Sequence, residues 1–527
     1  MRREEIIHRM SNTKTVWDMI VIGGGATGLG VAVEAASRGY TALLLEQGDF
    51  AQGTSSRSTK LIHGGVRYLQ TGDITLVLEA LHERGLLLQN APHLVHHQAF
   101  IVPNYEWWEG PFYGVGLKVY DMLAGKLGFG PSHHLSREET LKEIPTLEPE
   151  GLRGGVIYYD GQFDDARLAV ILARTLADLG GFPVNYARVT GLIKKKGVVR
   201  GVLAIDRESG AEYRIAARVV VNAAGIFVDD IRKMDISDSL PLISPSQGVH
   251  IVLDKSFLPG HSAIMVPHTD DGRVLFAVPW RDVVIVGTTD TPIPKPVLSP
   301  RPLPEEIDFL LTHAARYLTR DPTVKDVRSV FAGIRPLIQG TGASGTALLS
   351  REHQVMVSKN GLVTIAGGKW TTYRKMGQDT VDMAATIGGL EKHPSTTERL
   401  HLHGWVGEPD KIRPFPEHGA DAAALEALMR TRKDLEALIH PELPYRYVEV
   451  LWAIRYEMAR TLTDVLSRRL RALILNARAA MAAAPGVAAL MAKELEWDKE
   501  VEKEQVKEFC DIAHGYLPQA LYPPHKP

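Results

Sequence analysis

The sequence has almost no cysteine and almost no net charge. Cys510 is the only cysteine among 527 residues, so no internal disulfide can form, and a reducing cytoplasm suits the chain. Lys and Arg number 60 against 62 Asp and Glu, a formal charge of −2, whereas a nucleic-acid-binding protein should be far more basic. The 45% hydrophobic and 23% charged residues exclude a mainly disordered or fibrous chain. We therefore expect a globular protein that binds no nucleic acid.

The sequence also lacks a long uninterrupted apolar run. Arg2 and Arg3 are followed at once by acidic residues, where an export signal needs an apolar stretch. The most apolar early run, 19–33, contains five glycines and is not typical of a membrane-spanning helix. These absences predict a cytoplasmic protein and leave room for a peripheral membrane contact only.

A glycine-rich motif follows the short apolar run 19–22 and opens a helical stretch. A second buried strand, 41–45, ends at an acidic residue 18 positions past the last glycine of the motif, as in a dinucleotide-binding βαβ unit. Glycine lets the backbone approach a pyrophosphate, and a helix N-terminus offers free N–H groups. The alternative is a tight strand–helix turn without a ligand. The predicted contacts are Gly23, Gly25, Ala26, Thr27 and Gly28 to the pyrophosphate and Glu46 to the ribose hydroxyls.

The glycine motif does not distinguish FAD from NAD, but the segment after it favours a flavin. Residues 48–69 are rich in small and hydroxyl-bearing side chains. An extended flavin needs such a run, with accessible backbone, between its pyrophosphate and its ring. The predicted FAD contacts in this segment are Thr54, Ser55, Ser56, Lys60, Leu61, His63, Gly64 and Gly65.

Further motifs are spread along the chain. They are Gly53-Thr-Ser-Ser56, the run 60–69 (KLIHGGVRYL), Gly287-Thr-Thr-Asp290, Gly333-Ile-Arg-Pro336, Ser350-Arg-Glu-His353, the run 367–374 (GGKWTTYR), and, in the tail, the runs 440–445 and 455–461. Together these motifs resemble the FAD-dependent glycerol-3-phosphate dehydrogenases, over about residues 16–515. They are much more specific than the glycine motif.

The resemblance implies an α/β fold with a Rossmann-like FAD-binding domain, an inserted antiparallel β substrate domain and a C-terminal all-α domain. It implies oxidation of sn-glycerol 3-phosphate to dihydroxyacetone phosphate by hydride transfer from C2 to flavin N5, with electrons passed to a membrane quinone. The oxidase branch of the family uses oxygen and tends to carry an inserted segment; none is obvious here. Two competing hypotheses are an amino-acid or hydroxy-acid oxidase of the same fold and a flavoprotein without turnover.

The predicted boundaries follow changes in composition. Residues 1–15 are typical of a polar, loosely held leader, 92–160 of irregular structure and 245–300 of antiparallel strands. An FAD-dependent oxidoreductase region is predicted at 16–395. Its FAD-binding segments are 16–80, 150–240 and 330–395. Its substrate-domain segments are 81–149 and 241–329. The region is followed by a linker at 396–419, a helical domain at 420–515 and a tail at 516–527.

Cations recur in four of the motifs, each beside a glycine or proline turn. The resemblance places Arg67, Arg335, Arg351 and Lys369 around the substrate phosphate, with Tyr68 as a hydroxyl partner. Without the resemblance, each arginine is explained more simply by a surface salt bridge. A cluster of cations favours a phosphate substrate over the carboxylate of an amino-acid oxidase, for which one arginine suffices.

One histidine is predicted to act as the catalytic base. His250 matches an active-site histidine of the family, and nearby cations would keep it neutral and able to accept the C2 hydroxyl proton. On the residues alone, a single histidine in a strand is more often structural. His63 is the rival base, although it is expected to pack near the flavin ring, and Arg335 is the group that would orient the hydroxyl. The pairs His133-His134 and His401-x-His403 lack a ligand set at metal spacing, so we predict no metal.

The run 367–372 is predicted to begin a helix directly after a strand. Its N–H groups and helix dipole would stabilise the negative charge that hydride transfer leaves on flavin N1 and O2, and a plain capped helix start is the alternative. Lys369 is also predicted to be catalytic. The remaining predicted FAD contacts are Gly368, Lys369, Thr371 and Thr372 in this run and, from the family pattern, Val189, Ala224 and Gly225.

The helical tail carries an excess of arginine. Seven arginines and three acidic residues lie between 445 and 480, a net charge of +4. A basic helical face can bind anionic lipid headgroups, and family members on the quinone pathway are peripheral membrane proteins. A solvated face or a salt-bridge network between subunits explains the arginines equally well. We expect a cytoplasmic enzyme at the inner face of the cell membrane, and whether it forms a homodimer is left open.

Overall fold

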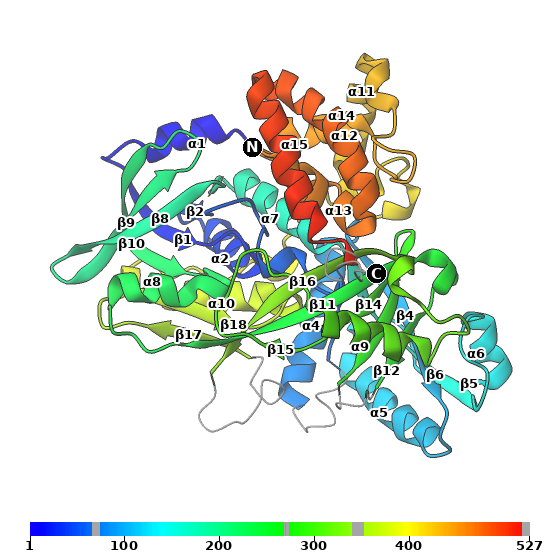
Figure 1. Cartoon of the computed structure of the whole chain (residues 1–527). Coiled ribbons are helices and arrows are strands. Elements are labelled where there is room, and N and C mark those ends of the chain that lie inside the picture. Colours follow the sequence, from blue (N-terminus) through cyan, green and yellow to red (C-terminus); the bar gives the residue numbers. More distant parts are fainter. Residues whose placement is uncertain (66–73, 268, 270–272, 340–351, 519–527) are drawn as a thin grey trace.

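The computed structural model describes residues 1–65, 74–267, 269, 273–339 and 352–518 (Figure 1). Within these ranges the chain forms a sheet of 8 strands, a sheet of 10 strands and a group of C-terminal helices. In Figure 1 the helical group lies above the two sheets. The α/β fold with a C-terminal all-α domain, predicted from the sequence, is confirmed.

The first sheet has a parallel centre. Its order is β17-β18-β10-β1-β2-β7, with β9 on β10 and β8 on β9. The strands are β1 (Val16–Ile22), β2 (Ala42–Leu45), β7 (Phe182–Val184), β8 (Ala187–Lys195), β9 (Val198–Asp206), β10 (Glu212–Asn222), β17 (His353–Val357) and β18 (Val363–Gly367). Helices α2 (Ala26–Ser37), α7 (Asp165–Asp178), α8 (Val228–Asp235) and α10 (Tyr373–Gly388) pack around it.

The register of the parallel strands aligns their carboxyl ends. Ile22 at the end of β1 pairs with Leu45 of β2 on one side and with Asn222 of β10 on the other. All four residues of β2 are buried, as expected for a strand covered on both faces. The loops that follow these three strands therefore meet at one edge of the sheet, where α/β proteins bind ligands.

Two helices cross at a pair of glycines behind this edge. A side chain at Gly377 of α10 would place its Cβ 2.6 Å from the carbonyl oxygen of Gly30 in α2. The close contact fixes α10, and with it the segment 367–372, against the helix that follows the glycine motif. Helix α7 begins at a side-chain cap, because Asp164 Oδ1 accepts from the N–H groups of Ala166 and Arg167.

The second sheet is mainly antiparallel, and the antiparallel strands predicted in 245–300 are confirmed. Its order is β15-β11-β14-β13-β12-β4-β6-β3, with β16 on β11 and β5 on β6. The strands are β3 (Leu61–Ile62), β4 (Val95–Asn104), β5 (His133–Ser136), β6 (Gly154–Phe163), β11 (Ile243–Asp254), β12 (Ala263–Val266), β13 (Leu275–Trp280), β14 (Val283–Gly287), β15 (Thr291–Pro292) and β16 (Val327–Ile338).

The prediction that 92–160 is irregular was wrong. This stretch contains β4, β5 and β6 as well as α5 (Glu109–Ala124) and α6 (Arg137–Glu143), and α4 (Ile74–Asn90) packs on α5. The last five residues of β4 are all buried, so they show no alternation of polar and apolar residues. Helix α5 contains Pro111 and Gly114 and exposes much of its apolar surface, so its sequence lacks the usual pattern of a buried helix. Helix α9 (Pro304–Ala315) also packs against this sheet, on β11.

The sequence suggested that the first residues are loosely held, but they form helix α1 (Arg3–Met10). Arg3 is buried, and its Nη2 lies 2.6 Å from Asp206 Oδ1. Ile6 and Met10 join the core of the first sheet. The segment is polar on average, so its composition did not indicate that Ile6 and Met10, one helical turn apart, pack it against the core of the first sheet.

The C-terminal helices have a core of their own. They are α11 (Ala422–Thr431), α12 (Tyr447–Tyr456), α13 (Ala472–Leu475), α14 (Ala477–Leu495) and α15 (Lys499–His514). This core also includes Trp280 and Phe331 of the second sheet, so the helical group is packed directly on that sheet. In the described part of the chain, none of the helices combines the length and the apolar composition needed to cross a bilayer.

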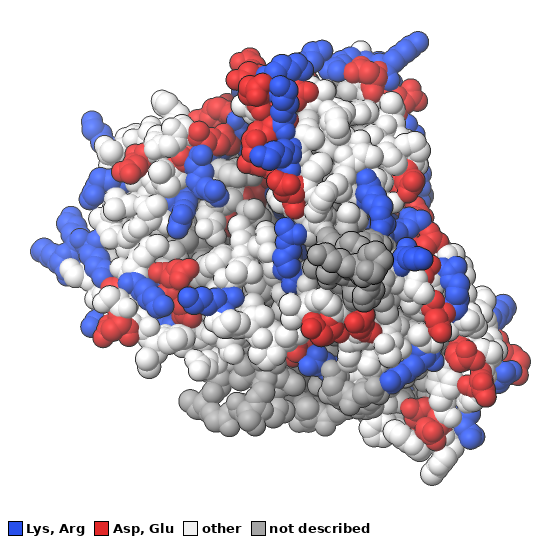
Figure 2. Space-filling view, in the orientation of Figure 1, with Lys and Arg blue, Asp and Glu red and all other residues white. Residues whose placement is uncertain are grey.

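The arginine-rich tail does not form a basic face. Arg468, Arg469 and Arg471 are buried and paired with carboxylates of the first half of the chain. Arg455 pairs with Glu494 and Arg460 with Glu208. On the face shown in Figure 2, Lys and Arg lie among Asp and Glu over the C-terminal helices. Five of the seven arginines are therefore paired with carboxylates of the same chain and do not form a free basic face.

Candidate active site

A cavity of about 490 Å³ lies at the carboxyl ends of β1, β2 and β10. Its lining also includes residues of β11 and β16 from the second sheet, so both sheets contribute to one site. Segments far apart in the sequence meet here because the parallel register brings their loops together. The predicted residues that line the cavity are Gly23, Gly25, Ala26, Thr27, Glu46, Thr54, Ser55, Leu61, His63, Val189, Ala224, Gly225, His250, Arg335, Gly368, Lys369 and Thr371.

Six predicted FAD contacts do not line the cavity: Gly28, Ser56, Lys60, Gly64, Gly65 and Thr372. Three of them have structural contacts instead. A Cβ on Gly28 would lie 1.9 Å from Gly23 O, and the N–H of Gly64 donates to Tyr120 Oη at 2.8 Å. Lys60 is fully buried, with Nζ 2.7 Å from Asp165 Oδ2. Motif membership alone did not distinguish residues that face the cavity from residues that support it.

The glycine motif has the geometry of a dinucleotide cradle. Gly23 has φ 114°, and a Cβ there would lie 2.5 Å from Ala223 O, so only glycine fits. Gly25 caps α2, whose N-terminus borders the cavity. Glu46 Oε2 accepts from Gly24 N at 2.6 Å and Oε1 from Gly48 N at 2.8 Å, although burial raises the pKa of this carboxyl. The cradle, the helix end and the acceptor at the end of β2 fit FAD.

The segment after the motif runs along the cavity wall. Ser55 Oγ accepts from Ala26 N at 2.9 Å, and Trp370 Nε1 donates to Ser55 O at 2.9 Å. The segment is thus tied to the glycine motif and to the turn before α10. Sequence reasoning missed the neighbouring cavity residues Gln52, Arg57, Ser58 and Thr59, which the same hydroxyl-rich run could have indicated.

His250 lies on β11 between that segment and Phe331. Its Nε2 is 2.9 Å from Thr59 Oγ1, and its ring stacks on Phe331 with centroids 4.7 Å apart. Burial, followed by the charges of Lys60 and Arg335, lowers the pKa of His250 well below its usual value. The imidazole is therefore neutral at physiological pH and able to accept a proton.

Arg335 projects from β16 and is held by the loop after β14. Nη1 lies 3.1 Å from Asp290 Oδ1, and Nη2 lies 3.0 Å from both Thr288 Oγ1 and Thr289 O. Asp290 also accepts a hydrogen bond from Ser246 of β11. Sequence reasoning assigned no role to Asp290, although the Gly287-Thr-Thr-Asp290 motif contained it.

The turn before α10 completes the described lining. Gly367 and Gly368 have φ 76° and 77°, conformations that favour glycine, and the turn brings Lys369 to the cavity. Thr371 Oγ1 lies 3.4 Å from both the N and O atoms of His63 and joins this turn to β3. The predicted substrate residues Arg67, Tyr68 and Arg351 lie outside the described residues.

His401 and His403, for which no metal was predicted, make contacts with other side chains of the chain. His403 lies between Asp178 and Asp421, with Nδ1 2.5 Å from Asp178 Oδ2 and Nε2 2.9 Å from Asp421 Oδ2. His401 stacks on Trp405. Over the ranges that the structure describes, no group of three or more His, Cys, Asp or Glu side chains is arranged to hold a metal ion.

Comparison with known proteins gives consistent matches over nearly the whole chain. The family model described as FAD dependent oxidoreductase matches residues 18–374, and the C-terminal domain of alpha-glycerophosphate oxidase matches 408–502. The human mitochondrial glycerol-3-phosphate dehydrogenase is 40% identical over 552 residues, covering 98% of this chain and 76% of that protein. The Arabidopsis thaliana mitochondrial enzyme is 40% identical over 540 residues, covering 94% and 86%.

Solved structures agree with the sequence relatives. The glycerol-3-phosphate dehydrogenase from Bacillus halodurans, complexed with FAD, has a TM-score of 0.79 and 30% identity, covering 98% of this chain and 97% of that one. The L-alpha-glycerophosphate oxidase from Mycoplasma pneumoniae, with a TM-score of 0.57 and 17% identity, shares the fold. The cavity, its FAD cradle and these matches show that the chain belongs to the family of FAD-dependent glycerol-3-phosphate dehydrogenases.

Proposed function

We propose that this protein oxidises sn-glycerol 3-phosphate to dihydroxyacetone phosphate. Relatives of this chain bear the name of that activity. The observation that carries the proposal is the cavity wall, where a neutral His250 contacts Thr59 beside the FAD cradle and Arg335 lines the same space. A base and a cation beside a flavin are the groups that oxidation of a phosphorylated alcohol needs.

The protein's own residues would divide the work as follows. His250 takes the C2 hydroxyl proton at Nε2, the nitrogen beside Thr59, which requires the tautomer with the other proton on Nδ1. Arg335, fixed by Asp290 and Thr288, holds the substrate oxygen in place. When bound, FAD supplies the hydride acceptor for the hydrogen that leaves C2.

Binding of the phosphate group is proposed from the resemblance together with the described cations. Lys369 lies beside the N-terminal end of α10, where positive charge also favours the reduced cofactor. We assign the phosphate to Arg67, Arg351 and Tyr68 as well. A phosphate held by several cations distinguishes this site from that of a carboxylate oxidase, for which a single arginine is enough.

We infer that the electrons go to a quinone and that the protein contacts the inner face of the cell membrane. The support is an exposed apolar face on α5 and the turn before it, with Trp107 at 75%, Phe112 at 53%, Val115 at 67% and Met122 at 80% exposure. Soluble surfaces seldom carry so many large apolar side chains on one helix. A membrane contact at α5 replaces the one first expected from the C-terminal arginines. Glycerol-3-phosphate oxidase activity is the alternative.

Steady-state assays with different substrates and acceptors test this proposal. The purified protein should turn over sn-glycerol 3-phosphate and leave glycerol, lactate and glycine unused. A short-chain ubiquinone should reoxidise it faster than air-saturated buffer. Preferred turnover of glycine or lactate would contradict the substrate assignment, and faster turnover with oxygen would show an oxidase.

A further inference from the structure

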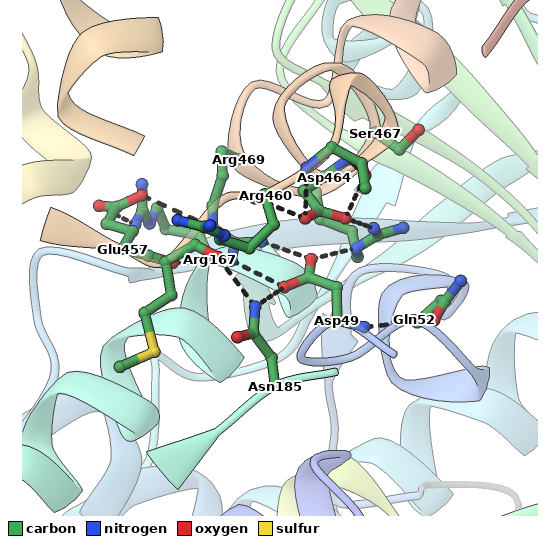
Figure 3. A network of polar contacts seen from close by, with 12 residues as sticks. Asp49, Gln52, Arg167, Asn185, Glu457, Arg460, Asp464, Ser467 and Arg469 are labelled. Carbon is green, nitrogen blue, oxygen red and sulfur yellow. Dashed lines mark hydrogen bonds and ion pairs between the residues drawn. The ribbon is translucent and has the colours of Figure 1, made fainter. Parts of the chain in front are cut away.

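A buried network of charges joins the C-terminal helices to the loop that follows β2 (Figure 3). Its centre is Asp49, which is fully buried. Arg468 Nε lies 2.5 Å from Asp49 Oδ2, while Arg469 Nη1 and Nη2 lie 2.7 and 2.9 Å from its two oxygens. The only other side chain that bonds this carboxylate, within the described residues, is Asn185, at 3.4 Å. The helical domain therefore supplies almost all of the partners of Asp49.

The loop around Asp49 supports the FAD cradle. Gly48 N donates to Glu46 Oε1, and Ala51 N donates to Gly24 O at 2.9 Å, inside the glycine motif. Asp49 N donates to Gln52 Oε1, and Gln52 lines the cavity. A displacement of Asp49 would thus move both the ribose acceptor and the glycine motif.

A second connection reaches the segment that runs along the cavity. Arg471 Nη2 donates to Ser56 O at 2.7 Å and to Asp165 Oδ1 at 3.0 Å. The other oxygen of Asp165 accepts from Ser58 N at 2.9 Å and from Lys60 Nζ at 2.7 Å. Arg471 and Asp165 together therefore fix the segment in which Ser55, Ser58 and Thr59 line the cavity.

The backbone that carries these arginines is unusual. Residues Asp464–Arg469 form a π-helical turn, and Arg471 has φ 61°, a left-handed conformation that is costly for a residue with a side chain. Such conformations persist where the surroundings fix them, and they gather at functional sites. Here they turn three arginines within four residues toward the cofactor-binding half of the chain.

We propose that Arg469 and Arg471 are positioning residues for FAD, through which the helical domain forms the outer support of the flavin site. Within the described residues, the cavity lining ends at Thr371, so the helical domain acts from behind the lining, and its arginines do so through Asp49, Asp165 and Ser56. The proposal goes beyond the proposed function and holds whatever the substrate is. By reciprocity, FAD binding must also stabilise the contact between the helical domain and the rest of the molecule.

The test is FAD affinity measured on folded variants. Arg471→Met removes Nη2, which donates to both Ser56 O and Asp165 Oδ1, and we expect the FAD Kd to rise about tenfold, a change typical of coupling between two sites. Reconstitution of the apoprotein is followed by flavin fluorescence well below the Tm of each variant. Arg455→Met, which breaks the Arg455–Glu494 pair within the helical domain, is the matched control and should leave the Kd unchanged. A Kd for Arg471→Met within about twofold of the wild type would overturn the proposal.

Two further measurements keep the test decisive if Arg471→Met does not fold. Arg471→Lys keeps the charge, but its one nitrogen cannot replace both Nη2, which donates to Ser56 O and Asp165 Oδ1, and Nη1, which donates to Ser467 O, so an intermediate Kd is expected. In the wild type, hydrogen exchange over 464–471 should be slower with FAD than without it, while α11 exchanges at the same rate. A wild-type Kd for Arg471→Lys, or equal exchange at 464–471 in both states, would show a role in folding alone.

Discussion

At the scale of single residues, His250 is surrounded by groups that disfavour its protonation. Burial contributes most to its lowered pKa, and Lys60 and Arg335 add positive charge nearby. Lys60 itself is a buried cation, paired with Asp165, and burial lowers its pKa to about 8. The imidazole is therefore in the neutral form that a general base requires, but the same surroundings also disfavour the imidazolium that proton transfer would form.

Replacement of His250 should separate proton transfer from cofactor binding. We expect His250→Asn to lower kcat by roughly 10²–10⁴-fold, the usual contribution of a general base, while the FAD content and the substrate KM stay close to wild type. Flavin absorbance and steady-state kinetics measure the two effects. Unchanged kcat would assign the base to another group, with His63 the next candidate.

Asp290 should affect catalysis by holding Arg335 in position. Asp290→Asn removes the negative charge beside Arg335 Nη1, and we expect kcat/KM to fall about tenfold or more, because a charge-assisted hydrogen bond contributes about 1.5–3 kcal/mol. Ser246→Ala removes the hydroxyl that donates to Asp290 and leaves its ion pair with Arg335, so it is the milder control. If Asp290→Asn lost FAD as readily as activity, its role would lie in the fold and not in substrate binding.

The sequence predicted the chemistry of the site better than the direction of each side chain. Gly23, Glu46 and Ser55 line the cavity because their motif fixes the backbone. Lys60 also lies in a motif, but its side chain points into a buried ion pair. Its partner Asp165 is 105 residues away in sequence, so the motif does not show the pairing. Long-range pairs of this kind leave no local pattern.

At the scale of elements, α5 carries large apolar side chains on its exposed side as well as on its buried side. Phe112, Val115, Val119 and Met122 recur at three- and four-residue spacing and are all more than 40% exposed. The βαβ unit was predicted because its apolar residues are buried and therefore form a regular pattern. Helix α5 was missed because its apolar residues lie on both its buried and its exposed side, so its sequence shows no single apolar stripe.

Charged residues on α5 should abolish membrane contact. We expect Phe112→Glu with Val115→Glu to leave the protein in the supernatant with anionic vesicles of phosphatidylglycerol and phosphatidylcholine, whereas the wild type pellets with them. Leu240→Glu, at an 80% exposed position outside α5, serves as the control. Equal pelleting of wild type and the double variant would place the contact elsewhere.

At the scale of the whole molecule, ion pairs and buried histidines hold the helical domain to α7 and to the sheets. Arg167 and Arg174 of α7 pair with Glu457 and Asp421. His93 lies at the same contact, where a Cβ on Gly419 would be 3.0 Å from its ring. Burial lowers the pKa of His93 to about 4. The contact between the domains therefore includes a buried histidine, His93, whose protonation disfavours the folded state.

Stability should therefore fall as the pH is lowered from 6.5 toward 4. In this range the unfolded chain binds a proton at His93, with its usual pKa of 6.5, that the folded protein excludes, a cost on the order of 3 kcal/mol at pH 4. Thermal unfolding across this range should show a falling Tm, and His93→Asn should reduce the slope. An identical slope in His93→Asn would mean that other groups, such as His418, control acid stability.

Anaerobic bleaching of the flavin is the most direct test that the protein binds FAD and oxidises sn-glycerol 3-phosphate. The yellow purified protein is mixed with sn-glycerol 3-phosphate in the absence of oxygen, and the flavin absorbance is followed. We expect prompt bleaching by this substrate, none by glycerol, and recovery of the yellow colour when a quinone is added. A yellow protein that stays oxidised with sn-glycerol 3-phosphate would keep the fold and the cofactor but contradict the proposed reaction.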